Sequence, residues 1–88
     1  MAEYRLIVRP TVDHDVRGIP KLTLRRIVAV IKALSDEPLP HGSSKLRGMD
    51  KTFRIRVGDY RIVYEVDSRE HVIDVLHVAH RRDVYRQR

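Results

Sequence analysis

Arginine supplies most of the chemistry that this sequence offers, and it does so in two segments. Arg54, Arg56 and Arg61 fall within "FRIRVGDYR", and three more arginines lie near the C-terminus in "HRRDVYR", which also holds His80 and Tyr85. A guanidinium stays charged at every working pH, and its planar fork can hold two oxygens of a phosphate. These residues would therefore suit a phosphorus centre that gains negative charge during a reaction. They can act together only if the fold gathers them on one surface.

A hairpin explains how three of these arginines would meet. Segments 52–57 and 60–66 alternate in hydropathy and flank Gly58-Asp59, which is a strong signal for a two-residue turn. Counting back from that turn places Arg56 opposite Arg61 on one face of the hairpin. The same register places Arg54 opposite Val63, and it fills the other face with Phe53, Ile55, Val57, Tyr60, Ile62 and Tyr64.

The facing arginines favour a functional reading. Like charges directly opposite one another destabilise a hairpin by roughly 0.2–1 kcal/mol, so a sequence selected only for folding would rarely keep Arg56 opposite Arg61. The alternative is a solvated face on which the arginines splay apart or pair with Glu65 or Asp59. Continuation of the same face into Arg81 favours the functional reading.

The other elements follow from the spacing of apolar residues. "YRLIV" alternates as a short strand, "TVDHDVRGIP" has helical spacing with Thr11 as a plausible cap, and Gly18 ends that helix. Pro20 opens a second helix, whose apolar stripe is Leu24, Ile27, Val28, Ile31 and Leu34. "SDEPLPHGSS" reads as a loop, and "HVIDVLHVA", apolar on both faces, reads as an interior strand.

This order predicts an α+β fold, β-α-α-β-β-β, in which a helical hairpin packs on a small, mostly antiparallel sheet. Residues 1–88 are expected to form one domain, because the chain is short and has no internal linker. Asp74 lies alone within the apolar strand, where it could serve as the partner of an arginine.

Composition narrows the class of partner. Eighteen basic and twelve acidic residues give a net charge of +6, which favours a polyanion: nucleic acid, an anionic membrane surface or an acidic protein. A basic surface kept for solubility is the alternative. The absence of cysteine fits a reducing cytoplasm, and neither a membrane span nor a signal peptide is expected.

Other site types have weak support in the sequence. His77 and His80 stand three apart, but no cysteine or patterned carboxylate accompanies them, so no metal site is expected. Neither the P-loop nor the dinucleotide-binding glycine pattern occurs. No cofactor is therefore predicted.

The segments "KLRGMDKTFRIRVGDYRIVYEV" and "VIDVLHVAHRRDVYR" resemble the RelE/ParE superfamily of toxins from type II toxin–antitoxin modules, and within it the RelE branch. The resemblance implies a ribosome-dependent endonuclease that cuts mRNA in the A site and inhibits translation. Attack of the 2′-hydroxyl on its own 3′ phosphate would leave a 2′,3′-cyclic phosphate without a metal.

Carried over by position, the family's catalytic residues fall on Arg54, Arg56, Arg61, Arg81 and Tyr85. Lys45, Arg47 and Arg82 are further candidates for contacting RNA. The family often has lysines at positions 54 and 56. Lysine can act as a general base, whereas arginine cannot readily lose its proton, so the base is unassigned and His80 is a candidate by chemistry alone.

The resemblance also implies a cognate antitoxin whose acidic, largely disordered segment folds around the toxin in a hetero-oligomer, docking on an exposed sheet edge and a helix groove. Two rival functions stay open at this point. One is a ParE-like toxin that inhibits DNA gyrase without cutting RNA, and the other is an inactive relative that binds only antitoxin or RNA.

Overall fold

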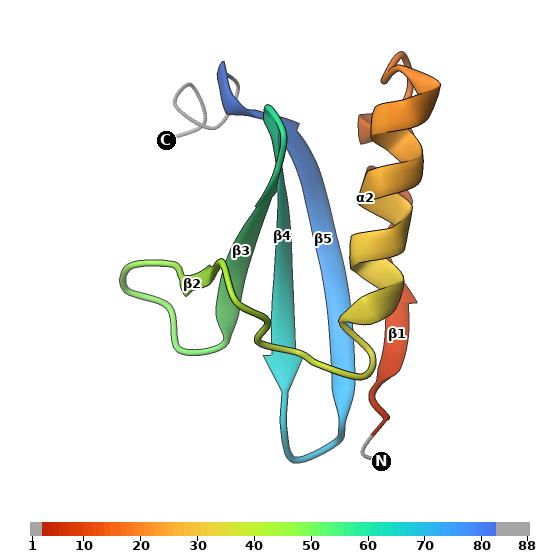
Figure 1. Cartoon of the computed structure of the whole chain (residues 1–88). Helices are drawn as coiled ribbons and strands as arrows, with labels where there is room; N and C mark the ends of the chain where they lie inside the picture. The colour runs from red at the N-terminus through yellow and green to blue at the C-terminus, as the bar shows by residue number, and fades with distance from the viewer. Residues whose placement is uncertain (1–2, 83–88) are drawn as a thin grey trace.

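A computed structural model describes residues 3–82 as a five-stranded sheet with helices on one face (Figure 1). In chain order the elements are β1 (Arg5–Val8), α1 (Pro10–Asp15), α2 (Lys21–Ala33), β2 (Ser43–Lys45), β3 (Thr52–Val57), β4 (Tyr60–Asp67) and β5 (Val72–His80). The strands lie in the order β1-β5-β4-β3-β2. Strand β1 is parallel to β5, and all other pairs are antiparallel. The predicted fold class is thus confirmed, with β5 in the interior of the sheet.

The β3–β4 hairpin has the predicted register. Arg56 pairs with Arg61, and Val57 pairs with Tyr60 across the turn. Gly58 opens the turn with a φ of 61°, a conformation that glycine adopts without steric cost. The apolar face of the hairpin packs under α2, and the buried core comprises Ile27, Ile31, Leu34, Ile55, Val57, Ile62, Tyr64, Ile73, Val75 and Val78, together with Val12 and Ile19.

Some details of the prediction were wrong. Val28 was expected in the core stripe of α2, but it is 39% exposed, and Val30 packs against the core instead. The end of the predicted loop, at Ser43 and Ser44, belongs to the three-residue strand β2. This strand forms by pairing with the edge of β3, and so short a segment carries too little hydropathy pattern to predict it.

Helix α1 covers part of the edge of β5 that β1 leaves open. The pairing of β1 with β5 ends at Val8–Val75. Beyond it the Thr11 hydroxyl donates to the Leu76 carbonyl at 2.7 Å, and the Val78 N–H donates to the Asp15 carboxylate at 3.0 Å. Side chains of α1 thus satisfy backbone groups that an open edge would expose. Thr11, expected as a helix cap, has this role instead, because the helix begins at Pro10.

Asp74 has the arginine partner that its isolation in an apolar strand suggested. Arg9 donates through Nε to Asp74 Oδ1 at 2.8 Å and through a terminal amino group to Oδ2 at 2.5 Å. This two-bonded contact raises the pKa of Arg9, first through the hydrogen bond and then through the charge of Asp74. The pair ties the start of α1 to β5. In the described residues, 3–82, no helix is long and apolar enough to cross a membrane.

Candidate functional site: an arginine face on the open side of the sheet

Three predicted site residues share the sheet face turned away from α2, which we term the arginine face and define by Arg54, Arg56 and Arg61. Side chains alternate along a strand, and the neighbours Ile55, Val57 and Ile62 all point into the core. Arg56 and Arg61 are direct partners across the hairpin. Arg56 is exposed, and Arg54 and Arg61 are partly exposed. The fold thus concentrates cations where no helix covers them.

Hydrogen bonds orient two of these arginines. Arg56 donates through Nε to the Gly58 carbonyl at 2.8 Å, and Arg54 donates through Nε to the Ser44 hydroxyl at 3.3 Å. A guanidinium has five N–H donors, and each of these bonds uses only the Nε donor. The bond orients the side chain and leaves its terminal amino groups available to a ligand. Ser44 lies on the arginine face because it pairs with Arg54. The sequence reading missed it, since the serine was assigned to a loop.

Arg81 joins this group from the end of β5. Its backbone N–H donates to the Asp59 carbonyl at 2.8 Å, while Arg56 binds the carbonyl of the preceding residue, Gly58. The β3–β4 turn and the end of β5 lie at the same end of the sheet (Figure 1). Arg81 is exposed there. The backbone of Arg81 therefore lies at the end of the sheet where Arg56 and Arg61 stand. Tyr85 lies outside the described residues.

Two other candidates lie elsewhere. His80 pairs with Tyr60, on the apolar side of the hairpin, and its ring meets the Tyr60 ring edge-on at 5.2 Å. Its Nδ1 also accepts the Arg82 backbone N–H at 3.2 Å. Lys45 pairs with Phe53, so it too is on the opposite face from Arg54. Neither side chain therefore extends over the arginine face in this structure.

Arg47 and Arg82 are both exposed, Arg47 in the turn that follows β2 and Arg82 just after β5. The two residues therefore lie in different parts of the fold, with Arg82 directly after Arg81. No group of three or more His, Asp or Glu side chains suited to a metal ion occurs among residues 3–82.

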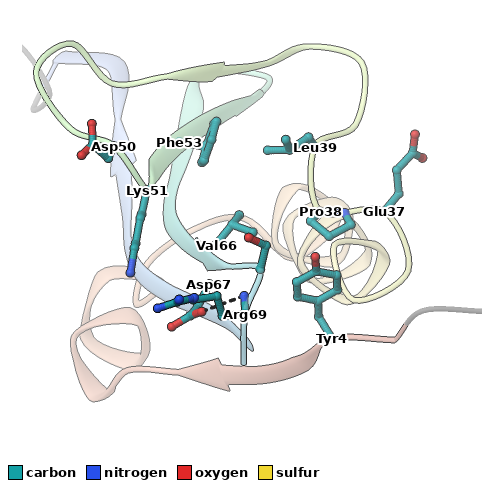
Figure 2. Close-up of a pocket in the computed structure, with 11 residues that line it drawn as sticks. Tyr4, Glu37, Pro38, Leu39, Asp50, Lys51, Phe53, Val66, Asp67 and Arg69 are labelled. Atoms are coloured by element: carbon teal, nitrogen blue, oxygen red, sulfur yellow. Dashed lines mark hydrogen bonds between the residues drawn. The ribbon is translucent and has the colours of Figure 1, made fainter. Parts of the chain in front are cut away.

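A cavity of about 540 Å³ lies away from the arginine face, where the segment after α2 crosses the apolar side of the sheet (Figure 2). Its floor is largely apolar, with Tyr4, Pro38, Leu39, Phe53 and Val66, and charged residues including Lys51, Asp67 and Arg69 stand at its rim. The Asp67 carboxylate accepts the backbone N–H groups of Glu70 and Arg69 at 3.0 and 3.1 Å. These bonds, that of Glu70 foremost, lower the pKa of Asp67. The carboxylate thus holds the β4–β5 turn.

The arginine face can bind and polarise a phosphate, but it cannot remove a proton. A five-coordinate phosphorus carries extra negative charge, and guanidinium groups that are already oriented would stabilise that charge. They hold their protons at any working pH. Any reaction that begins by deprotonating a hydroxyl therefore needs another side chain or solvent.

Comparisons with known proteins give matches over most of the chain. The family model described as the ParE toxin of the type II toxin–antitoxin system parDE matches residues 2–85. The toxin RelG of Mycobacterium tuberculosis is 37% identical over 75 residues, which are 81% of this chain and 86% of that protein.

Chains from two solved complexes also resemble this chain in fold. The archaeal RelE–RelB complex from Pyrococcus horikoshii contains a chain with a TM-score of 0.80 and 31% identity, covering 92% of this chain and 97% of its own. The toxin–antitoxin complex RelBE2 of M. tuberculosis contains one with a TM-score of 0.77 and 30% identity, covering 91% and 93%.

Proposed function

The chain belongs to the RelE/ParE superfamily of toxins from type II toxin–antitoxin systems, and from this premise we propose that it is a cytoplasmic, ribosome-dependent mRNA endonuclease. The observation that carries the proposal is the arginine face, where Arg56 and Arg61 stand directly opposite one another. Such a pair weakens the hairpin, and a polyanion bound between the two side chains would offset their repulsion.

The proposed reaction is attack of a 2′-hydroxyl on the adjacent 3′ phosphate, which breaks the bond to the 5′ oxygen and leaves a 2′,3′-cyclic phosphate. Arg61 and Arg81 would clamp the phosphate oxygens, with Arg54 and Arg56 adding positive charge beside them. Tyr85 would stack on or orient the target nucleotide, as aromatic side chains do with single-stranded RNA. The ribosome would hold the mRNA in the conformation that this in-line attack requires.

The test uses the whole toxin and ribosomes programmed with a defined mRNA. Primer extension should reveal cuts within the A-site codon. The released upstream fragments, analysed by mass spectrometry, should carry a 2′,3′-cyclic phosphate. Arg81→Ala should cut at least about 100-fold more slowly, a loss typical of removing one electrostatic contact to a transition state. Intact A-site codons with the wild type, or equal cutting by Arg81→Ala, would exclude the proposed nuclease.

A second candidate function has a specific observation in its favour, because the matching family model is described as a ParE toxin. A toxin of that kind would trap complexes of gyrase with cleaved DNA and leave mRNA intact. The ribosome assay and a gyrase-cleavage assay, run on the same preparation, give opposite results for the two functions. Binding of RNA that weakens steeply with salt but leads to no cleavage would instead indicate an inactive relative.

We also propose a cognate antitoxin as the physiological partner, in line with the RelE–RelB complexes among the similar structures. Helix α2 offers it an apolar groove of about 330 Å³, lined by Lys21, Leu24, Arg25 and Val28. Nearby Leu22 is 74% exposed. Apolar anchors flanked by cations suit an amphipathic, acidic segment, whose folding on the toxin would bury them.

A further inference from the structure

His77 lies on the arginine face, although no role was predicted for it. Its neighbour Val78 is 3% exposed and points into the core, so alternation turns His77 to the other side of the sheet. In the ladder His77 pairs with Val63, and Val63 pairs with Arg54. These three residues form one row across β3, β4 and β5.

The same ladder places His77 next to the predicted phosphate clamp. The direct partner of Arg61 is Ala79, two residues along β5 from His77. Diagonal neighbours of this kind lie roughly 7–8 Å apart, a span that long side chains can bridge. A ligand that spans β4 and β5 can therefore contact Arg61 and His77 together.

A carboxylate stands behind the imidazole. Asp15, at the end of α1, has Oδ2 3.4 Å from His77 Nδ1, and the same oxygen accepts the Val78 backbone N–H at 3.0 Å. The Val78 bond fixes the carboxylate on the edge of β5. With its Nδ1–H directed at Asp15, a neutral His77 presents the lone pair of Nε2. The His77 side chain is 52% exposed, which leaves that nitrogen open to a ligand.

His80 lacks this arrangement. It lies on the face with Tyr60, and its Nδ1 accepts the Arg82 backbone N–H. A neutral ring bonded in this way carries its proton on Nε2, so neither nitrogen offers a free lone pair. Of these two histidines, the geometry favours His77 as a proton acceptor.

We propose that His77 is the general base of the proposed nuclease and that Asp15 is its positioning residue. Nε2 takes the proton of the 2′-hydroxyl while the 2′ oxygen forms its bond to phosphorus. The bond from phosphorus to the 5′ oxygen breaks, that oxygen takes a proton from water, and the imidazolium releases its proton to solvent. Asp15 stabilises the imidazolium, as a carboxylate does behind a catalytic histidine. The inference rests on the proposed function.

Charged groups from neighbouring elements lie around His77. Asp15 and Arg17 line a cavity of about 240 Å³ with it, and His80 contributes to the same lining. Arg61 lies diagonally across the β4–β5 ladder from His77, and Arg54 lies in the same row beyond Val63. Because the base must be neutral to act, the cleavage rate of the wild type should fall as the pH is lowered. This fall, the acid limb of the pH–rate profile, should be less steep in a variant without the imidazole.

The experiment measures single-turnover cleavage on programmed ribosomes by the wild type, by His77→Gln and by the control His41→Gln, whose exposed histidine lies in the loop before β2. His77→Gln should cut about 100-fold or more slowly, the usual contribution of a general base, and His41→Gln should cut at the wild-type rate. Asp15→Asn, which keeps an oxygen for the Val78 N–H, should lose less activity and should also flatten the acid limb.

A second substrate separates a base from an acid. An mRNA with a bridging 5′ sulfur at the cleavage site has a leaving group that needs no proton, so a defect in a general acid disappears and a defect in a base persists. Persistence of the His77→Gln defect supports the proposal. Recovery on this substrate, or cleavage of ordinary mRNA within threefold of the wild type, overturns it and leaves the proposed nuclease standing. Failure of the wild type to cut overturns the proposed function instead.

Discussion

Replacing Arg61 with threonine should make the fold more stable while it disables the proposed nuclease. Arg61 stands opposite Arg56 in the β3–β4 ladder, and removing one of two facing like charges should recover roughly 0.2–1 kcal/mol. Threonine is also a favourable strand residue. Arg61 is the better choice of the two because Arg56 also bonds to the Gly58 carbonyl, and its removal would lose that contact.

The magnitude translates into a measurable shift. For a domain of this size, 1 kcal/mol moves the thermal midpoint by about 4–8 °C, so Arg61→Thr should raise it by roughly 1–8 °C. The gain should shrink with added salt, because the repulsion lies at the surface and is screened. Cleavage on ribosomes should fall by about 100-fold or more, since the substituted arginine belongs to the proposed phosphate clamp.

Arg54→Thr is the matched control. Arg54 faces Val63 rather than another cation, and it donates to Ser44, so its removal relieves no facing charge and should give no stabilisation. Urea unfolding of both variants at low and high salt makes the comparison. A midpoint for Arg61→Thr at or below that of the wild type, or a gain matched by Arg54→Thr, would refute the claim that the facing pair weakens the hairpin.

Three further predictions concern other parts of the molecule. Tyr64 is fully buried and donates to the Pro38 carbonyl at 2.8 Å, so Tyr64→Phe should cost about 1–2 kcal/mol of unfolding free energy in urea titrations; an unchanged midpoint would contradict this role. The turn bonds lower the pKa of Asp67 below 3.8, so its contribution to stability is complete above that value and is lost as the pH falls through the folded pKa. Asp67→Asn should therefore lower the thermal midpoint at pH 7 and lower it less at pH 2, and an equal deficit at both would count against the linkage. Val28→Asp should weaken antitoxin binding at least about tenfold in calorimetry without altering toxin stability. The control Ala29→Asp should bind the antitoxin more tightly than Val28→Asp, since Val28 lines the α2 groove and Ala29 does not; equal affinities would argue against that docking site.

Local patterns were sufficient to predict the hairpin and its register. The Gly58-Asp59 turn and the alternation on either side of it determine which residues face one another, and one apolar face leaves a single acceptable register. The resemblance placed Arg81 with that pair, and the Arg81 N–H bond to Asp59 now gives a structural reason.

What could not be predicted depends on contacts between distant segments. Strand β2 exists because β3 offers an edge to pair with, and Val28 is exposed because of how α2 lies on the sheet. His77 was read as an ordinary histidine for the same reason. Its partner Asp15 is 62 residues away in the chain, and an irregularity in the β4–β5 ladder next to His77 interrupts the simple alternation used to assign faces.

The central claim is that the arginine face binds the scissile phosphate, and the rate of A-site cleavage by paired charge-neutralising variants tests it most directly. Arg61→Gln removes a cation from the arginine face, and Arg25→Gln removes one from exposed α2, on the other side of the sheet, so both lower the net charge equally. The account predicts a loss of about 100-fold or more for Arg61→Gln and a wild-type rate for Arg25→Gln. Equal rates for the two variants would contradict it.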